Sequence, residues 1–226
     1  MKSRRRFTPT ALVALAIVAC VLAGTADARH HGPHGPRGGE PGQFDYYLLT
    51  LSWSPTYCLT HPDDRYECGR QGYGFVLHGL WPQYQAGGYP EHCATGARLD
   101  AAAERAGLMV YVSPQLMYHE WQAHGTCSGL DAATYFRAAD RALASVRIPA
   151  AFEAPRRARS MTARALVDAF RAANPQLPEN AVRVACSRGE LAEVRICLNR
   201  DLSPRACGRA VRSGCGGDAF DVPATR

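Results

Sequence analysis

Lysine is nearly absent from this sequence of 226 residues: of its 26 basic residues, only Lys2 is not arginine. No C-x-x-C pair occurs, which disfavours a zinc site built from cysteines. No G-x-S-x-G segment occurs either, which excludes the nucleophile elbow of a serine hydrolase. No repeat or second linker divides the chain after its leader, so we expect one domain.

The first 28 residues have the pattern of a secretory signal peptide. Lys2 and three arginines precede an apolar run at residues 11–24, and Ala26-Asp27-Ala28 offers a cleavage site after Ala28. The run is too short to span a bilayer comfortably, so export is favoured over a membrane anchor. One alternative stays open, because residues 17–20 resemble a lipoprotein box that would leave Cys20 lipidated. Residues 29–43 form a leader rich in glycine, proline and histidine, for which we expect disorder.

Export changes both the charge and the cysteine count. Without residues 1–28 the chain has 22 basic residues (26 minus 4) and 19 acidic residues (20 minus 1), a net charge of +3. This weak surplus permits an anionic partner without indicating one. Of nine cysteines, eight remain once Cys20 is removed. An even number in an exported chain predicts a disulfide framework, although spacing alone does not choose the pairing.

Residues 44–226 are expected to form one α+β domain, with a central, mainly antiparallel sheet and packed helices. Strands and helices are mixed, without regular βαβ alternation. The last two strands are expected to pair across the turn at residues 187–190. Apolar patterns and turn signals predict strands at 44–53, 73–80, 182–186 and 191–198, and helices at 100–112, 131–146 and 162–173.

Two histidines and a carboxylate stand close together in Tyr118-His119-Glu120-Trp121-Gln122-Ala123-His124-Gly125-Thr126-Cys127. Interpreted as a helix, this segment places Glu120 and His124 on one face, where the carboxylate can orient the imidazole and stabilise its cation. His119 and His124 are five residues apart, whereas the zinc peptidase signature H-E-x-x-H requires a spacing of four. The pattern therefore favours general acid–base chemistry over a metal site.

A second histidine segment is Phe75-Val76-Leu77-His78-Gly79-Leu80-Trp81-Pro82-Gln83. Alone, His78 would be taken for a hydrogen-bonded core histidine and Trp81 for a core aromatic. Together with His124, however, His78 completes a pair of imidazoles, one to accept a proton and one to donate it. Such a pair suits cleavage of RNA through its own 2′-hydroxyl. An indole beside the site can stack on a base without identifying it.

These two segments resemble the active-site segments of the ribonuclease T2 family, and the resemblance extends over residues 44–217. It implies an α+β fold and an exported endoribonuclease of low base specificity. Its products would pass through 2′,3′-cyclic phosphates to 3′-phosphates. The expected substrate is single-stranded RNA, the expected enzyme is a monomer without metal or other cofactor, and it contacts no membrane. The expected location is the periplasm or the exterior of the cell.

When the family's functional residues are matched to this sequence by position, the resemblance implies that His78 and His124 are the acid–base pair and that Glu120 is the third catalytic residue. It favours His124 as the base, although the sequence itself leaves the assignment open. His119 would bind phosphate and Trp81 would stack on a base. The family layout of cysteines implies disulfide bonds Cys58–Cys68, Cys93–Cys127, Cys186–Cys215 and Cys197–Cys207.

The chain departs from the family pattern at two positions. Ala123 replaces a lysine that precedes the last histidine and stabilises charge on the phosphate; loss of one such donor can cost about 10²–10³ in rate. The sequence leaves two alternatives open: Ala123 lowers the activity, or an arginine from elsewhere compensates for the lysine. Gln83 stands where some relatives have an acid that contacts adenine, which leaves base preference open. The alternative function is a weakly active or inactive relative that acts as an RNA-binding or toxin-like secreted protein.

Overall fold

The structure is a computed structural model that describes residues 38–94, 96–216 and 219–225. The expected signal peptide and most of the expected leader lie outside these residues. The rest of that leader contacts the domain: the Gly38 amide donates to the Glu91 carbonyl and the Gly42 amide to the Cys127 carbonyl. Within the described part of the chain, the search for a helix long and apolar enough to cross a membrane finds none.

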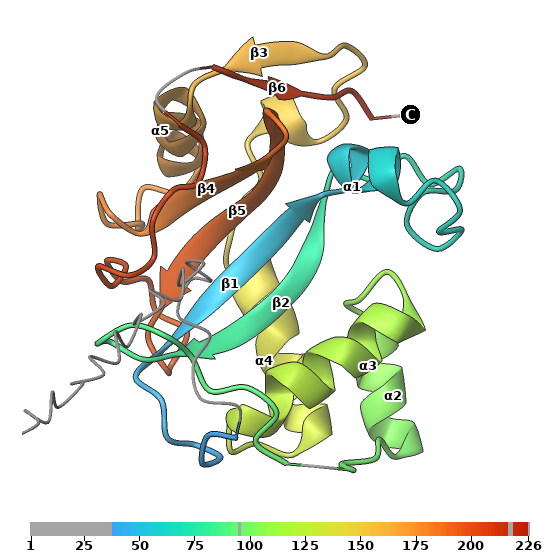
Figure 1. The fold of residues 1–226 in the computed structure, drawn as a ribbon, viewed down its shortest axis with the longest axis vertical. Coiled ribbons are helices and arrows are strands. Elements are labelled where there is room, and N and C mark those ends of the chain that lie inside the picture. Colours follow the sequence, from blue (N-terminus) through green and yellow to red (C-terminus); the bar gives the residue numbers. More distant parts are fainter. Residues whose placement is uncertain (1–37, 95, 217–218, 226) are drawn as a thin grey trace, which may run out of the picture. The chain divides into compact units, whose positions relative to one another are not determined.

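One mixed sheet forms the centre of the domain, and Figure 1 shows β1, β2 and β5 side by side in it. Its strand order is β2-β1-β5-β6-β3, and β4 also pairs with β5. All pairings are antiparallel except that of β5 with β6, which confirms the expected mainly antiparallel sheet. The strands are β1 (Tyr46–Trp53), β2 (Phe75–Gln83), β3 (Arg159–Met161), β4 (Val182–Ser187), β5 (Glu190–Leu198) and β6 (Phe220–Val222).

The second strand runs further than its sequence predicts. We expected it to end at Leu80, before Pro82, but β2 continues to Gln83, and Pro82 pairs with Tyr47. Because β2 is the last strand in the sheet order, the missing N–H of Pro82 does not interrupt a ladder on its outer side. The hairpin between β4 and β5 forms as expected: Arg188 (φ 52°) and Gly189 (φ 83°) supply the positive φ angles of a two-residue turn.

Each of the three predicted helices is present, and each begins at a capping side chain. Asp100, Asp131 and Thr162 accept hydrogen bonds from amides of the first turns of α2, α4 and α5. Helix α1 was not predicted, because Ser54-Pro55 reads as the end of a strand; a proline in the first turn also suits a helix start. The α-helices are α1 (Ser54–Thr60), α2 (Ala101–Leu108), α3 (Pro114–Ala123), α4 (Ala132–Ala144) and α5 (Ala163–Ala173).

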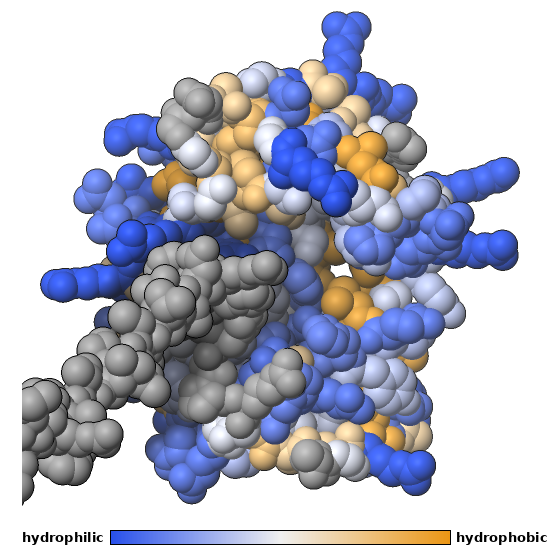
Figure 2. Space-filling model, viewed as in Figure 1, coloured by the Kyte–Doolittle hydropathy of each residue, from blue (hydrophilic) through white to orange (hydrophobic). Residues whose placement is uncertain are grey.

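The core lies between the sheet and the helices α4 and α5. Leu51 and Leu77 of the sheet are fully buried there, as are Phe136 of α4 and Phe170 of α5. Most residues on the face shown in Figure 2 are hydrophilic, and apolar residues appear in separate areas. The opposite side of β1 carries a smaller cluster around Leu48, next to Trp81.

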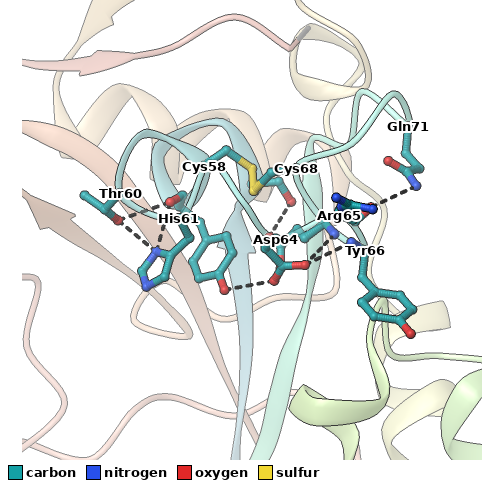
Figure 3. The surroundings of a disulfide bond; sticks show 11 residues. Cys58, Thr60, His61, Asp64, Arg65, Tyr66, Cys68 and Gln71 are labelled. Carbon is teal, nitrogen blue, oxygen red and sulfur yellow. Dashed lines mark hydrogen bonds between the residues drawn. A yellow bond between two sulfur atoms is a disulfide. The ribbon is translucent and has the colours of Figure 1, made fainter.

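Four disulfide bonds connect the domain, with the pairing that the family resemblance implies: Cys58–Cys68, Cys93–Cys127, Cys186–Cys215 and Cys197–Cys207. Cys58–Cys68 ties α1 to the loop that follows it, where Asp64 accepts a hydrogen bond from the Tyr66 amide (Figure 3). Cys93–Cys127 ties the short 3₁₀ turn after α3 to the loop after β2. This bond therefore joins the segment after His78 and Trp81 to the segment that carries Glu120 and His124.

Candidate active site

His78 lies at an irregularity of the sheet. Thr50 pairs with Gly79, but the next residue, Leu51, pairs with Leu77, so His78 is an extra residue in β2. Such a bulge re-aims a side chain away from the regular alternation of the strand. The His78 imidazole remains 30% exposed. The bulge therefore presents an accessible imidazole from a strand whose neighbouring residues Leu77 and Leu80 are fully buried.

Helix α3 brings Glu120 to this imidazole. The nearer pair is Glu120 Oε1 and His78 Nε2, 3.7 Å apart, and His119 Nε2 lies 4.0 Å from the same oxygen. Among the described residues, the ion pairs of Glu120 are with His78 and His119 and do not include the expected one with His124. His124 follows the end of α3, and its dihedral angles (φ −123°, ψ −43°) are not helical, so the four-residue spacing no longer places the two side chains on one face.

A glycine allows Glu120 to meet the indole of Trp81. The Trp81 Nε1–H donates a hydrogen bond to Glu120 Oε2 at 2.7 Å. A Cβ atom at Gly79 would overlap both the carboxylate of Glu120 and the indole nitrogen of Trp81. Gly79 is therefore required for this contact, which holds the indole plane beside the two histidines.

The carboxyl group of Glu120 is almost completely buried. Burial raises its pKa to about 7, and the positive charge of His78 and the hydrogen bond from Trp81 oppose that rise without cancelling it. Its Oε1 is a buried atom with no hydrogen-bond partner among the described residues. Near neutral pH, both protonation states of Glu120 are therefore populated.

Glu193 of β5 is a site residue that the sequence did not reveal. Its Oε1 lies 2.8 Å from Nδ1 of His78, and its Oε2 accepts from Nε and from a terminal nitrogen of Arg195 at 2.8 and 2.6 Å. Because a carboxylate oxygen only accepts, the proton is assigned to Nδ1, and Nε2 is the nitrogen free to exchange one. The signal in the sequence was a glutamate inside a strand, two residues before Arg195 and therefore on the same face.

The pKa of His78 is raised by the carboxylates around it. Burial alone would lower it, but the hydrogen bond with Glu193 and the charges of Glu120, Glu193 and Glu67 outweigh burial. Burial also acts on Glu193, yet the hydrogen bond with His78 and the charge of Arg195 hold the pKa of that carboxyl below its usual range. The arrangement therefore favours a cationic His78 beside an ionised Glu193.

His124 lies in the opposite electrostatic environment. Its ring centroid is 5.0 Å from that of Trp81 and 6.0 Å from that of Tyr89, and the residue is 7% exposed. Burial lowers its pKa to about 3, and repulsion from His119, His78 and His92 adds to this effect. His124 is therefore neutral at physiological pH. Both imidazoles pack against Trp81, whose ring centroid is also 5.0 Å from that of His78.

Ala123 does not share the exposed face of His119. The His119 side chain is 63% exposed, and its pKa is lowered by burial and by the charges of His78 and His92. Ala123 is fully buried. A side chain at position 123 therefore does not lie beside His119 on the exposed surface of α3. Arg195 lies 5.8 Å from the Trp81 ring centroid, but Glu193 already pairs with its charge.

Two further expectations concern base contacts and metals. Gln83 is 7% exposed and donates to the Pro82 carbonyl, so its amide is engaged within its own strand. Among the described residues, no group of three or more histidine, cysteine, aspartate or glutamate side chains is arranged to hold a metal ion. The site thus offers one imidazole that favours its cation, one neutral imidazole, a buried carboxyl and an indole.

Comparisons with known proteins agree with the motifs. The model of the ribonuclease T2 family matches residues 44–207. A ribonuclease of Aeromonas hydrophila is 59% identical over 92 residues, which cover 41% of each protein. Ribonuclease 3 of Arabidopsis thaliana is 33% identical over 114 residues, which cover 42% of this chain and 50% of that one. The chain thus spans about half the length of these curated relatives, or less.

The fold is also that of a solved structure. An RNase-related protein from Calystegia sepium superimposes with a TM-score of 0.66, and the match covers 83% of this chain and 100% of that one. The two sequences are 23% identical, so this likeness concerns the fold alone. It agrees with the expected α+β domain.

Proposed function

This chain belongs to the ribonuclease T2 family, and from the geometry of its site we propose that it is an endoribonuclease that cleaves single-stranded RNA without a metal ion. The observation that carries the proposal is the contrast between the environments of two imidazoles that both pack against one indole. His78 lies among carboxylates, while His124 is buried away from them, with a pKa of about 3. Such a pair holds a proton donor and a proton acceptor together at neutral pH.

In the proposed mechanism, neutral His124 takes the proton of the 2′-hydroxyl. The 2′ oxygen then forms a bond to phosphorus while the bond from phosphorus to the 5′ oxygen breaks. His78 donates the proton on Nε2 to that leaving oxygen. The products are a 2′,3′-cyclic phosphate and a free 5′-hydroxyl. In a second step the roles reverse, and a water molecule opens the ring to a 3′-phosphate.

Because its pKa is low, His124 is neutral and can accept a proton, but it is a weak base. A phosphodiester bound between the three imidazoles brings a negative charge that opposes the repulsion from His119 and His78. Substrate binding therefore raises the pKa of His124 toward the range in which proton transfer from a hydroxyl is efficient. In the proposal, His119, which is exposed and 4.0 Å from Glu120, contacts the same phosphate.

Glu120 and Trp81 complete the proposed site. Glu120 lies close to His78 and accepts from the indole of Trp81, so it links the proton donor to the stacking surface. An indole offers only its π-face to a base, which accounts for low base specificity. Gln83 cannot add selectivity while its amide is bonded to Pro82.

We also propose that the protein is exported and acts as a monomer in the periplasm or outside the cell. Four disulfide bonds suit an oxidising compartment. Export would depend on the signal at residues 1–28, which lies outside the described residues. The alternative, a secreted RNA-binding protein without activity, would show no turnover in the following experiment.

The roles of the two histidines are tested with a substrate whose leaving group needs no proton. A nucleoside 3′-(4-nitrophenyl phosphate) releases a stable anion, whereas a dinucleotide must protonate its leaving oxygen. We expect His78→Ala to lose about 10²–10⁴ in rate on the dinucleotide but little on the nitrophenyl ester, and His124→Ala to lose that rate on both. The opposite pattern would reverse the roles, and near-normal turnover of either variant on the dinucleotide would contradict the proposal.

A further inference from the structure

His92 is a histidine at the edge of the site that the proposed mechanism does not use. It lies in the loop of residues 84–93, which follows β2 and ends at the disulfide-bonded Cys93. Its side chain is 49% exposed. Tyr89 of the same loop lies beside His124, with ring centroids 6.0 Å apart. The loop therefore borders the site, and His92 offers an accessible imidazole there.

Two bonds fix the position of His92 relative to α3. Its amide donates a hydrogen bond of 2.9 Å to the carbonyl oxygen of Ala123, the last residue of α3. The bond lengths between that oxygen and the Cα atom of His124 place the His92 nitrogen within about 7 Å of that Cα atom. The next residue, Cys93, is joined to Cys127 by a disulfide bond. His92 is thus held close to the proposed base.

The backbone of His92 is left-handed, with a φ of 54°. This conformation is uncommon for a residue with a side chain, although asparagine, aspartate and histidine adopt it more often than others. Residues held in this way gather at sites of binding and catalysis. A glycine at this position could donate the same hydrogen bond to Ala123 without strain. The imidazole therefore has no part in fixing the loop to α3.

The charge of His92 acts on the two histidines that the proposed mechanism places around the phosphate. It lowers the pKa of His119 and that of His124, in both cases after the larger effect of burial. Such repulsion requires the charged groups to lie close together. A phosphate between His119 and His124 is negative, so the same proximity makes its interaction with His92 attractive.

A single carboxylate pairs with His92 among the described residues, and it holds the imidazole weakly. Oε1 of Glu91 lies 3.9 Å from Nε2 of His92, which is longer than a hydrogen bond. Both side chains are partly exposed, and exposed pairs of this kind contribute little. The His92 imidazole can therefore turn to a phosphate without losing a strong contact.

The end of α3 lacks a cation on the helix itself. Carbonyl groups at the C-terminus of a helix carry partial negative charge, which disfavours a phosphate beside them. His124 stands at this end, and the proposed mechanism brings a phosphate to it. Ala123 is fully buried and offers no charge, and the charge of Arg195 is already paired with Glu193. An imidazole at position 92 offsets the partial charge of the helix end.

We propose that His92 binds the phosphate of the cleaved bond beside His119, and supplies there a donor that Ala123 lacks. This inference rests on the proposed ribonuclease function. An imidazole can donate a hydrogen bond to a phosphate oxygen in either protonation state, and it adds a positive charge when protonated. The contact strengthens in the transition state, where the phosphate carries more negative charge. His92 therefore increases the rate as well as the affinity for substrate.

The first test is the affinity of a nucleoside 3′-phosphate, measured by calorimetry. This ligand carries only the phosphate of the cleaved position, and it is not cleaved. His92→Asn tolerates the left-handed backbone but has a shorter side chain, and His92→Gly has none; in both, the affinity should fall about tenfold. His92→Arg keeps a charged donor and should stay within about threefold of the wild type.

A matched control removes another exposed histidine. The Nδ1 atom of His61 lies 2.9 Å from the Thr60 hydroxyl at the end of α1, and the proposed site does not include it. His61→Asn should therefore leave the affinity for the nucleoside 3′-phosphate unchanged. The Tm of His92→Asn should also match that of the wild type, because the amide bond to Ala123 is kept.

Kinetics on a dinucleotide then show whether the contact strengthens in the transition state. For His92→Asn and His92→Gly, kcat/KM should fall about 30-fold, which is more than the loss of affinity, and kcat should fall with it. A purely structural role for His92 would lower the Tm and would not separate these two losses. Equal losses, or a loss in His92→Arg as large as in His92→Asn, would contradict a charged contact with the phosphate.

The binding measurement also separates this inference from the proposed function. If the protein cleaves nothing, the proposed function fails, and the affinities for the nucleoside 3′-phosphate still decide whether His92 contacts a phosphate. An affinity that stays at the wild-type value in both His92→Asn and His92→Gly overturns the inference, even if the wild type is an active ribonuclease.

Discussion

Replacing Glu120 with glutamine should stabilise the protein at alkaline pH while it impairs the site. In the unfolded chain this carboxyl titrates near its ordinary pKa of 4.5, whereas burial raises the pKa to about 7 in the folded protein. The folded state therefore holds the proton more tightly. The unfavourable contribution of Glu120 to folding appears as the pH rises above 4.5 and reaches its full size above 7.

The size of that contribution follows from the same two values. A difference of about 2.5 between 4.5 and about 7, at about 1.4 kcal/mol for each unit of pKa, gives about 3 kcal/mol. Glutamine has the shape of the protonated acid, and its amide oxygen can still accept from Trp81. Glu120→Gln should therefore equal the wild type in stability at pH 4 and exceed it by about 3 kcal/mol at pH 8, or by about 6–12 °C in Tm.

Urea unfolding at pH 4 and pH 8 measures this difference directly, with equal m-values as the check that both proteins unfold in the same way. The matched control is Glu179→Gln, a change of the same chemistry at an exposed residue, which should give no such gain. Activity of Glu120→Gln should fall at the same time, because the carboxylate beside His78 is lost. A variant no more stable than the wild type at pH 8, after matching it at pH 4, would refute the burial argument.

Three further changes test the surroundings. His124→Asn should make the protein more resistant to acid. Burial depresses the pKa of the imidazole from 6.5 to about 3, so the wild type loses stability as the pH falls below 6.5. The free energy of unfolding of the variant minus that of the wild type, measured with urea, should therefore be about 3 kcal/mol more favourable at pH 4 than at pH 7. Glu193→Gln should move the alkaline limb of the pH–rate profile to lower pH, because His78 loses its charged partner; an unmoved limb would contradict this. Replacing Cys93 and Cys127 with serine should cost about 2–5 kcal/mol in thermal unfolding and lower kcat, and full activity would show that this bond does not position the site.

Motifs with a local cause could be predicted from the sequence. Caps such as Asp131 and Thr162 act on amides three residues away, so the starts of α4 and α5 follow from the chain itself. The hairpin at Arg188-Gly189 is equally local. His78 and Trp81 could be chosen as candidate site residues because the two histidine segments are long and specific to the family.

Contacts that depend on pairing between distant segments could not be predicted. Glu193 reaches His78 only because β5 lies beside β1 and a bulge turns the histidine toward it. His124 leaves the helical geometry at the end of α3, and no pattern of spacing within that segment showed where the helix would stop. The burial of Ala123 could not be predicted either, because it depends on packing against other segments and not on the spacing from His119.

The most direct test of the account is the chemical form of the cut ends. The purified protein is incubated with a chimeric oligonucleotide that contains one ribonucleotide, in excess chelator, and the products are followed by ³¹P NMR. The account predicts a 2′,3′-cyclic phosphate at that ribonucleotide, followed by a 3′-phosphate, with no cleavage of an all-deoxy strand. A 5′-phosphate product, cleavage of the all-deoxy strand, or activity that disappears with chelator and returns with zinc would contradict it.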